Sequence, residues 1–526
     1  MIKLFNCTNC SRRLVRAGLL SLLISFGFIS TNAQSSFDRL NVYAGWHKQL
    51  NDTLRGANVT GLYNFIQSKR LKPRRTVVVG IVDSGADTAC VALRPSLWTN
   101  AKEILDGKDN DGNGYIDDRH GWNFLGTKDG KFNMTSAGTE EYREFKRLYP
   151  KYKNVKSAEQ VAPADREEYA YYVDMRKKAK INSYLMFFEI STKKQQALAS
   201  IDSIVHAMPK LSVDTLTLKG LISLKVTDSR WDNLVQAMVT DLYRTPLTTT
   251  WNKYLASQRA DHQLMARRIW GIEHDKDKRL LMGDNMLDAN DRYYGNNNVG
   301  IDGDDHGNFV ASIVAGQPKD ERYAGIDPQA KLMIVRVSPD GDEYDKDVSS
   351  GLRYAVDNGA KVINLSLGKY TSPQAAMVND AIAYAAAHDV LIIAAAGNNS
   401  LNIDSVAYFP SAVDKDGKPY ANYIRVGASG RDGKRLSLSN YGSAHVDLYA
   451  PGELIAGVYP GDKCDLADGT SVAAPVVTAI AAMLRAYYPK LKASEVKNIL
   501  VRSARQENGI KVVDAEAAFK GVRKLK

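Results

Sequence analysis

The chain has 526 residues, of which 44% are hydrophobic and 25% charged, and its formal net charge at neutral pH is +11. This length allows two or three domains with sizeable cores. The sequence has no low-complexity tract or short-period repeat, which excludes a disordered or solenoid protein. The positive excess is small for a chain of this length and is not clustered beyond the N-terminus, so we expect no nucleic-acid partner.

The N-terminus has the parts of a secretory signal peptide. An apolar run, AGLLSLLISFGFIST, follows four basic residues: Lys3, Arg12, Arg13 and Arg16. We predict a signal peptide over residues 1–33, cleaved after Ala33, and export to the periplasm or the extracellular space. The run is shorter than the roughly 20 residues of a spanning helix, so we expect no membrane span in the mature protein. Cleavage would leave two cysteines, Cys90 and Cys464, whose pairing the sequence leaves open.

From residue 76 onward, apolar segments that end in turns alternate with segments of helical periodicity. We predict strands at residues 76–85, 330–337, 361–368, 390–398, 422–429 and 446–452. We predict helices at 349–360 and 373–389, and an earlier helix at 58–70 within an N-terminal segment of residues 34–75. This alternation predicts an α/β fold in which a parallel β-sheet is covered by helices on both faces.

Residues 127–270 differ from the rest of the chain. They are rich in charges, and they have helical periodicity and few strand-like runs, as in TEEYREFKRLYPKYKN. We predict a large, mainly helical insertion here, which divides the α/β domain into residues 76–126 and 271–526. The insertion could steer substrates or act as a docking module.

Three polar residues stand at predicted strand ends or helix starts. Asp83 closes a buried strand in VVVGIVDSGAD, His306 precedes an apolar helix in GDDHGNFVASIVAG, and Ser471 lies in DGTSVAAP. A nucleophilic serine needs an imidazole to take its proton and a buried carboxylate to orient that imidazole. Each residue also has an ordinary interpretation: a turn-forming Asp, a surface His and a Ser that caps a helix.

A metal-hydrolase site would be another use of the histidine block. His306 would then share a metal with its acidic neighbours Asp302, Asp304 and Asp305. These residues lack the helical or turn spacing of metal ligands, so we do not favour this alternative.

At these three blocks the sequence resembles the subtilisin-like serine peptidases, over roughly residues 40–126 and 271–526. The chain order Asp, His, Ser is that of subtilisin. The resemblance implies that Asp83 orients the imidazole, that His306 is the general base and acid, and that Ser471 attacks the substrate carbonyl. It also implies an extended polypeptide substrate and no cofactor in the chemistry.

The resemblance further implies an oxyanion hole and a substrate-binding cleft. The match at IIAAAGNNS makes Asn398 the side-chain donor to the oxyanion, with Asn399 as the alternative and the backbone N–H of Ser471 as its companion. Substrate would pair with a family edge strand and enter a first specificity pocket. The corresponding residues are Ser366, Leu367 and Gly368 on one side and Ala395, Ala396 and Gly397 on the other.

Two features depart from the family pattern. The histidine block usually continues Gly-Thr-His-Val-Ala-Gly, but here His306 is followed by GNFVAS, which alters the packing of the helix behind the base. Only about 40 residues separate Ala33 from the first strand. This is too short for the usual prodomain, so we expect the protein to fold without one.

An acidic loop, KDNDGNGYIDD, is a candidate calcium site. Asp109, Asp111, Asn113 and Asp117 offer oxygen ligands at the spacing that hard cations prefer. The loop resembles the start of an EF-hand, but His120 occupies the position of the bidentate Glu. A surface turn rich in Asx and Gly residues is an equal alternative, and the calcium that subtilisin-like enzymes often bind is what keeps the metal in consideration.

These observations predict an exported serine endopeptidase that hydrolyses peptide bonds through an acyl-enzyme intermediate. The alternative is a non-catalytic binding or scaffold protein with the same fold. The altered histidine block and the large insertion are the features that favour this alternative.

Overall fold

A computed structural model of the chain describes residues 43–301, 303 and 305–522. The predicted signal peptide and two residues of the metal-hydrolase alternative, Asp302 and Asp304, lie outside the described residues. The chain divides into two units, Met1–Ala44 and Gly45–Lys526. The strands of the fold and the helices that cover them belong to the second unit.

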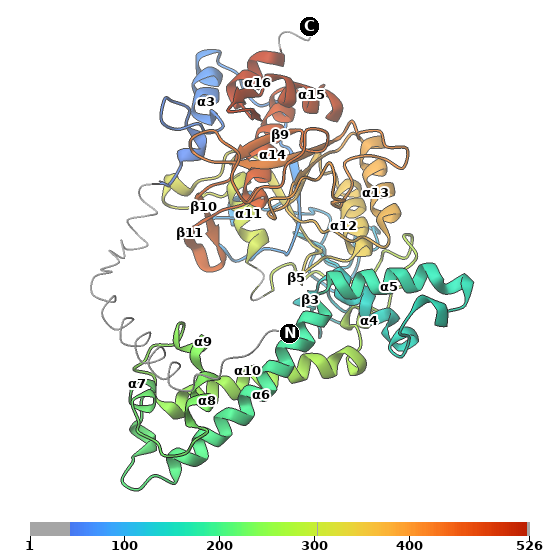
Figure 1. Cartoon of the computed structure of the whole chain (residues 1–526). Helices are drawn as coiled ribbons and strands as arrows, with labels where there is room; N and C mark the ends of the chain where they lie inside the picture. Colours follow the sequence, from blue (N-terminus) through green and yellow to red (C-terminus); the bar gives the residue numbers. More distant parts are fainter. Residues whose placement is uncertain (1–42, 302, 304, 523–526) are drawn as a thin grey trace. The chain divides into compact units, whose positions relative to one another are not determined.

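The centre of this unit is a nine-stranded sheet in the order β12-β13-β9-β8-β7-β6-β1-β4-β2 (Figure 1). Its strands are β1 (Val78–Asp83), β2 (Gly121–Asn123), β4 (Lys331–Arg336), β6 (Val362–Leu365), β7 (Leu391–Ala395), β8 (Tyr423–Ser429), β9 (Leu448–Pro451), β12 (Arg505–Glu507) and β13 (Ile510–Val512). All neighbouring strands pair in parallel except β12 and β13, which are antiparallel. Because central parallel strands are buried on both faces, they are mainly apolar, and this explains why the sequence located them.

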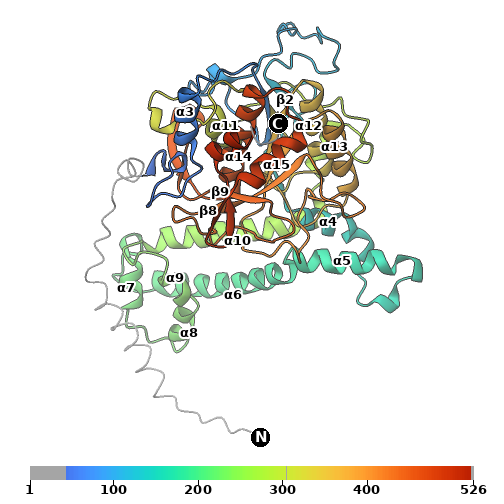
Figure 2. The same ribbon diagram turned by 90° about the horizontal axis from the view of Figure 1, so that it is seen from above.

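Two groups of helices cover the sheet. Helices α12 (Asp345–Asp357) and α13 (Ala375–Ala387) pack against each other on one face. Helices α11 (His306–Ala315) and α14 (Thr470–Tyr487) pack against each other on the other face, joined by α15 (Ala493–Ser503) (Figures 1 and 2). The predicted α/β architecture is therefore confirmed. Parallel strands end at one common edge of the sheet, so the segments that follow β1, β6 and β7 lie close together there.

Helix α14 fills the core beneath the sheet. Among the described residues, it is the one helix that is long and apolar enough to cross a membrane, and 94% of it is buried within the protein. It contacts β6, β7, β8 and β9, as a core helix does.

The remaining secondary structure flanks this body. Helix α3 (Val59–Ser68) confirms the predicted N-terminal helix and packs against α16 (Ala515–Gly521). An antiparallel hairpin of β10 (Ile455–Tyr459) and β11 (Lys463–Ala467) immediately precedes α14 and was not predicted.

Between β2 and α11 the chain is mainly helical. It forms a short strand, β3 (Ser136–Gly138), which pairs with β5 (Asp340–Gly341). Seven α-helices follow: α4 (Glu140–Tyr152), α5 (Arg166–Lys178), α6 (Ile181–His206), α7 (Leu218–Ile222), α8 (Trp231–Gln236), α9 (Val239–Leu242) and α10 (Trp251–His274). Helices α6 and α10 lie side by side (Figure 2). Two separate apolar clusters hold this part together, one around Trp251 and one around Tyr172.

Candidate active site

Asp83 and His306 form a hydrogen-bonded pair at the edge of the sheet. Asp83 is the last residue of β1 and is 1% exposed, whereas His306 opens α11 and its side chain is 46% exposed. Their Oδ1 and Nδ1 atoms are 2.7 Å apart. Since an ionised carboxylate only accepts, Nδ1 carries the proton and Nε2 is free to accept one. Burial lowers the pKa of His306, but the charge and hydrogen bond of Asp83 raise it by more, so the net direction is upward.

Glycine allows this pair to form. A Cβ atom on Gly307 would lie 2.2 Å from the carbonyl oxygen of Gly85, so only glycine lets α11 approach the loop after β1 this closely. The backbone N–H of Gly307 also donates to Ser84 Oγ at 3.0 Å, and the N–H of Ser84 donates to Asp83 Oδ1 at 2.7 Å. The start of α11 is therefore tied to the loop that follows the carboxylate.

Ser471 is the second residue of α14, where the N-cap residue is Gly469 and no side chain caps the helix. The interpretation of Ser471 as a helix cap is therefore wrong. Its carbonyl accepts a hydrogen bond from Ser366 Oγ at 2.7 Å, and Ser366 in turn accepts one from Asn364 Nδ2 at 2.9 Å. The first turn of α14 is thus fixed to the segment that follows β6.

Ser471 and His306 line one pocket of about 220 Å³. Its other lining residues come from the segments after β6 and β7, from the start of α14 and from one loop: Ser366, Leu367, Gly368, Ala395, Gly397, Asn398, Asn399, Tyr408 and Thr470. Five of the six predicted substrate-binding residues therefore share a pocket with the predicted nucleophile. The sixth, Ala396, is fully buried behind the wall, where its carbonyl accepts from Asn440 Nδ2.

The side-chain amide of Asn398 is held by Thr470. Both the backbone N–H and the hydroxyl of Thr470 donate to Asn398 Oδ1, each at 2.9 Å. This fixes the amide so that its NH₂ group is left for another acceptor. A Cβ atom on Gly469 would lie 3.1 Å from Asn398 Nδ2 and 3.4 Å from Ser471 Oγ, so the amide and the hydroxyl both border the space beside Gly469. Asn399 instead accepts from the hydroxyl of Tyr370 at 2.8 Å.

Two residues of this site were missed by the sequence analysis. Thr470 is fully buried, and its hydroxyl also accepts from the N–H of Gly397 at 3.0 Å, so it links both sides of the pocket. Its place beside Ser471 in the GTS block was an available signal. Tyr408 lies in a loop far along the chain from Ser471, and nothing in its sequence context pointed to the pocket.

The altered histidine block packs against the unpredicted hairpin. The ring of Phe309 lies 4.7 Å from that of Tyr459 and covers Gly457, where a Cβ atom would lie 2.7 Å from the ring. Asn308 Nδ2 donates to the carbonyl of Val458 at 2.8 Å. The departures from the family pattern therefore have partners in β10, and they leave the bond between His306 and Asp83 in place.

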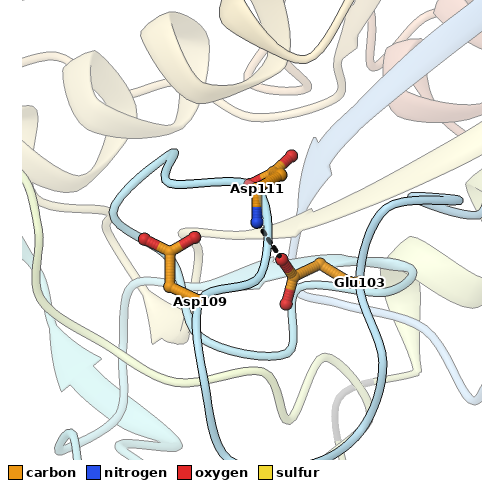
Figure 3. A group of neighbouring side chains, drawn as sticks. All are labelled: Glu103, Asp109 and Asp111. Atoms are coloured by element: carbon orange, nitrogen blue, oxygen red, sulfur yellow. Dashed lines mark hydrogen bonds between the residues drawn. The ribbon is translucent and has the colours of Figure 1, made fainter.

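The acidic loop brings three carboxylates together (Figure 3). Ligand atoms of Glu103, Asp109 and Asp111 lie within 4.8 Å of one another. Glu103 was not among the predicted ligands. The carboxylate of Asp117 instead accepts from the backbone N–H of Asp106 at 3.0 Å, and Asn113 Oδ1 accepts from the N–H of Tyr115 at 2.8 Å.

Cys90 and Cys464, whose pairing the sequence left open, both have free thiols. Cys90 is buried and its Sγ donates to Asp462 Oδ1 at 3.3 Å. Cys464 lies in β11 and is partly buried.

Relatives of known activity match the chain. Subtilisin BL of Lederbergia lenta is 34% identical over 223 residues, which are 41% of this chain and 78% of that protein. The cell wall-associated protease of Bacillus subtilis (strain 168) is 34% identical over 257 residues, 48% of this chain and 27% of that protein. Among solved structures, the prenylagaramide maturation protease PagA is 30% identical with a TM-score of 0.37, over 41% of this chain and 82% of that chain.

The relatives and the fold define the class of this protein, which is a serine-type endopeptidase. The sequence model of the subtilase family matches residues 74–517. The chain therefore belongs to the subtilase family.

Proposed function

We propose that this protein is an exported endopeptidase that hydrolyses polypeptides through an acyl-enzyme formed on Ser471. The observation that carries the proposal is the 2.7 Å bond between Asp83 and His306 beside a pocket that His306 shares with Ser471. A binding protein would not need an imidazole at this position, since a half-exposed imidazole gains little stability from the bond.

The chemistry would begin with a proton transfer. Nε2 of His306 takes the hydroxyl proton of Ser471 as the oxygen attacks the substrate carbonyl, and the buried Asp83 carboxylate stabilises the imidazolium that forms. The imidazolium then returns the proton to the leaving amine. Water, activated by the same imidazole, releases the acyl group and restores the serine hydroxyl.

The oxyanion of the tetrahedral intermediate would be bound by two donors. One is the Asn398 amide, which Thr470 orients, and the other is the backbone N–H of Ser471 in the first turn of α14. Donors fixed in advance need no reorganisation as the charge develops, and the positive end of the helix dipole adds to the effect.

An extended polypeptide is the proposed substrate. Residues 366–368 follow β6, and residues 395–397 comprise the last residue of β7 and the two after it, so both segments lie at the same edge of the sheet as Asp83. Substrate added beside these segments would bind through its main chain, and the pocket would accept one side chain.

A fluorophosphonate probe tests the proposal, because it modifies only an activated serine. We expect one equivalent of label on the wild-type protein and none on Ser471→Ala, with cleavage of fluorescently labelled casein lost in the same variant. A folded wild-type protein that neither labels nor cleaves casein would favour the scaffold alternative.

Export is the second part of the proposal. The basic and apolar N-terminal segment supports a signal peptide of residues 1–33. N-terminal sequencing of protein recovered outside the cytoplasm should begin at Gln34. An N-terminus at Met1 in that fraction would contradict the cleavage.

Calcium in the acidic loop is the third part. Three converging carboxylates, from Glu103, Asp109 and Asp111, are a donor set that suits a hard divalent cation. Excess chelator should then lower the unfolding temperature of the wild type but not that of Asp109→Asn. An unchanged unfolding temperature in chelator would support the surface-turn alternative.

A further inference from the structure

The first turn of α4, at the start of the helical insertion, is joined to the pocket segment by a buried ion pair. Glu140 Oε2 lies 2.5 Å from Lys369 Nζ, and the two side chains are 7% and 1% exposed. Lys369 directly follows Gly368, which lines the pocket. A residue of the insertion therefore contacts the chain one position away from the pocket wall.

Lys369 is enclosed by acceptors. Its Nζ also lies 2.9 Å from Asp345 Oδ1 and donates to the carbonyl of Glu343 at 2.7 Å. Burial lowers the pKa of Lys369, but Asp345, Glu140 and Glu343 raise it by more, so the amine is a cation. Three acceptors from two parts of the chain thus hold this ammonium group at one point.

A second contact lies two residues further along. The hydroxyl of Thr371 donates to Glu141 Oε1 at 2.6 Å. Two adjacent residues at the start of α4, Glu140 and Glu141, therefore bind Lys369 and Thr371, which follow the pocket residue Gly368 in the chain. Within the insertion, Arg143 Nη2 donates to Glu140 Oε2 at 2.6 Å, and this bond helps to fix the carboxylate.

The backbone of Lys369 completes the connection to the pocket. Its N–H donates to the carbonyl of Phe409 at 3.1 Å, and the N–H of Phe409 donates back to the carbonyl of Lys369 at 2.9 Å. The neighbours of this pair, Gly368 and Tyr408, both line the pocket, and a Cβ atom on Gly368 would lie 2.5 Å from the hydroxyl of Tyr408. With so little clearance, a shift at Lys369 would change the pocket.

We propose that the helical insertion positions the substrate pocket, with Glu140 and Lys369 as positioning residues. A buried ion pair adds little net stability compared with apolar packing, but it requires one geometry. The ion pair between Glu140 and Lys369 would therefore set the separation between Gly368 and Tyr408 in the pocket. The proposal rests on the proposed function of the pocket, and it assigns to the insertion an effect on substrate binding that a simple docking module would lack.

Three variants test it. Glu140→Gln removes the charge that pairs with Lys369, and Thr371→Val removes the donor to Glu141 without leaving a buried charge. The control is Glu144→Gln, the same chemical change about one turn along α4. Glu144 pairs with Arg147 at 2.8 Å and, within the described part of the chain, makes no hydrogen bond or ion pair to residues 366–371.

The measurements are the unfolding temperature, the fraction of protein labelled by fluorophosphonate, and KM and kcat on a peptide chosen from a library digest by the wild type. We expect Glu140→Gln to raise KM with kcat nearly unchanged, so that kcat/KM falls by between about 10- and 100-fold. Thr371→Val should raise KM less, and Glu144→Gln should behave as the wild type.

A merely structural role gives a different result. It would lower the labelled fraction and the apparent kcat together and leave KM unchanged, and that outcome overturns the proposal. If Glu140→Gln does not fold, Thr371→Val decides, and a wild-type KM in that variant overturns the proposal. A wild type that neither labels nor cleaves would instead refute the proposed function.

Discussion

Thr470→Val is the most informative single change near the nucleophile. The substitution keeps the side-chain volume and removes only the hydroxyl. That hydroxyl donates to Asn398 Oδ1 at 2.9 Å and accepts from the N–H of Gly397 at 3.0 Å. Valine breaks both bonds at a fully buried position, while the backbone N–H of residue 470 still donates to Asn398.

The effect on stability follows from the group left without a partner. The N–H of Gly397 would be buried and unsatisfied, which costs about 1–3 kcal/mol, and the lost bond to Asn398 costs about 1 kcal/mol more. The free energy of unfolding should therefore fall by about 2–4 kcal/mol, and the unfolding temperature should fall by a few degrees.

The effect on turnover follows from the remaining restraint on Asn398. Losing an oxyanion donor altogether costs about 10²–10³ in kcat, a magnitude measured in a subtilisin itself. Here the amide keeps one of its two bonds, so we expect kcat to fall by about tenfold. KM should hardly change, because the donor acts mainly on the charge of the transition state.

Steady-state kinetics on a wild-type peptide substrate and thermal unfolding measure both effects. Thr470→Ser is the control, since it keeps the hydroxyl and should retain most of kcat. A Thr470→Val enzyme with wild-type kcat would show that the hydroxyl does not orient Asn398. An equal loss of kcat in Thr470→Ser would assign the effect to the methyl group.

Three further predictions concern charges and the oxyanion donor. Although burial lowers the pKa of His306, Asp83 raises it above 6.5 on balance, so kcat/KM should fall as the pH drops through that raised pKa. Asp83→Asn should move this fall to lower pH and reduce kcat by about 10⁴-fold, which a pH–rate profile would reveal. Asn398→Ala should reduce kcat by about 10²–10³, and because it removes the acceptor of both Thr470 donors it should also lower the unfolding temperature by a few degrees. Burial raises the pKa of Glu343 from 4.5 to about 7, so the native state binds its proton more tightly and stability should fall as the pH rises from 4.5 to about 7. Glu343→Gln should abolish that fall and be more stable at pH 8 by up to about 3 kcal/mol, measured by unfolding at each pH; the same pH dependence in both proteins would exclude Glu343 as its source.

Six of the nine strands of the sheet could be predicted from sequence because they are mainly apolar, whereas β2, β12 and β13, of three residues each, were missed. Strands β1, β6, β7 and β8 are buried at almost every position, so each gave a mainly apolar run, interrupted by Asn364 in β6 and Arg425 in β8. The residues that follow such strands meet at one edge of the sheet, which is why short motifs far apart in the chain could be assigned to a common site.

Elements with weaker apolar signals were not located individually: α10 falls largely within the region predicted to be mainly helical, and the β10–β11 hairpin was missed. Helix α10 buries residues only near its ends, such as Trp251 and Ile272, and the long polar stretch between them shows little periodicity. The β10–β11 hairpin is interrupted by Gly457 and Pro460, which are common in loops. Glu103 could not be assigned to the acidic loop because it precedes the loop motif, and only the folded backbone brings it back to Asp111.

The helical insertion lies in the chain between Asp83 and His306. Contacts at both of its ends lead to the first turn of α12 and hold those ends to the body of the protein. At the start, Glu140 meets Lys369, which also pairs with Asp345 of α12. At the end, Arg279 pairs with Asp347 of the same turn at 2.6 Å, with both side chains fully buried.

Asp345 and Asp347 lie in one turn of α12, and α4 and α10, the first and last helices of the insertion, contact each other, so the chain enters and leaves the insertion near a single place. The closure cost of a loop grows only with the logarithm of its length, and here it is offset by these buried contacts at the base. The length of the insertion therefore hardly affects how the body brings His306 to Asp83, whereas its base adjoins the pocket. An insertion anchored in this way can vary in its outer helices without disturbing the candidate catalytic residues, but not in the residues that hold Lys369.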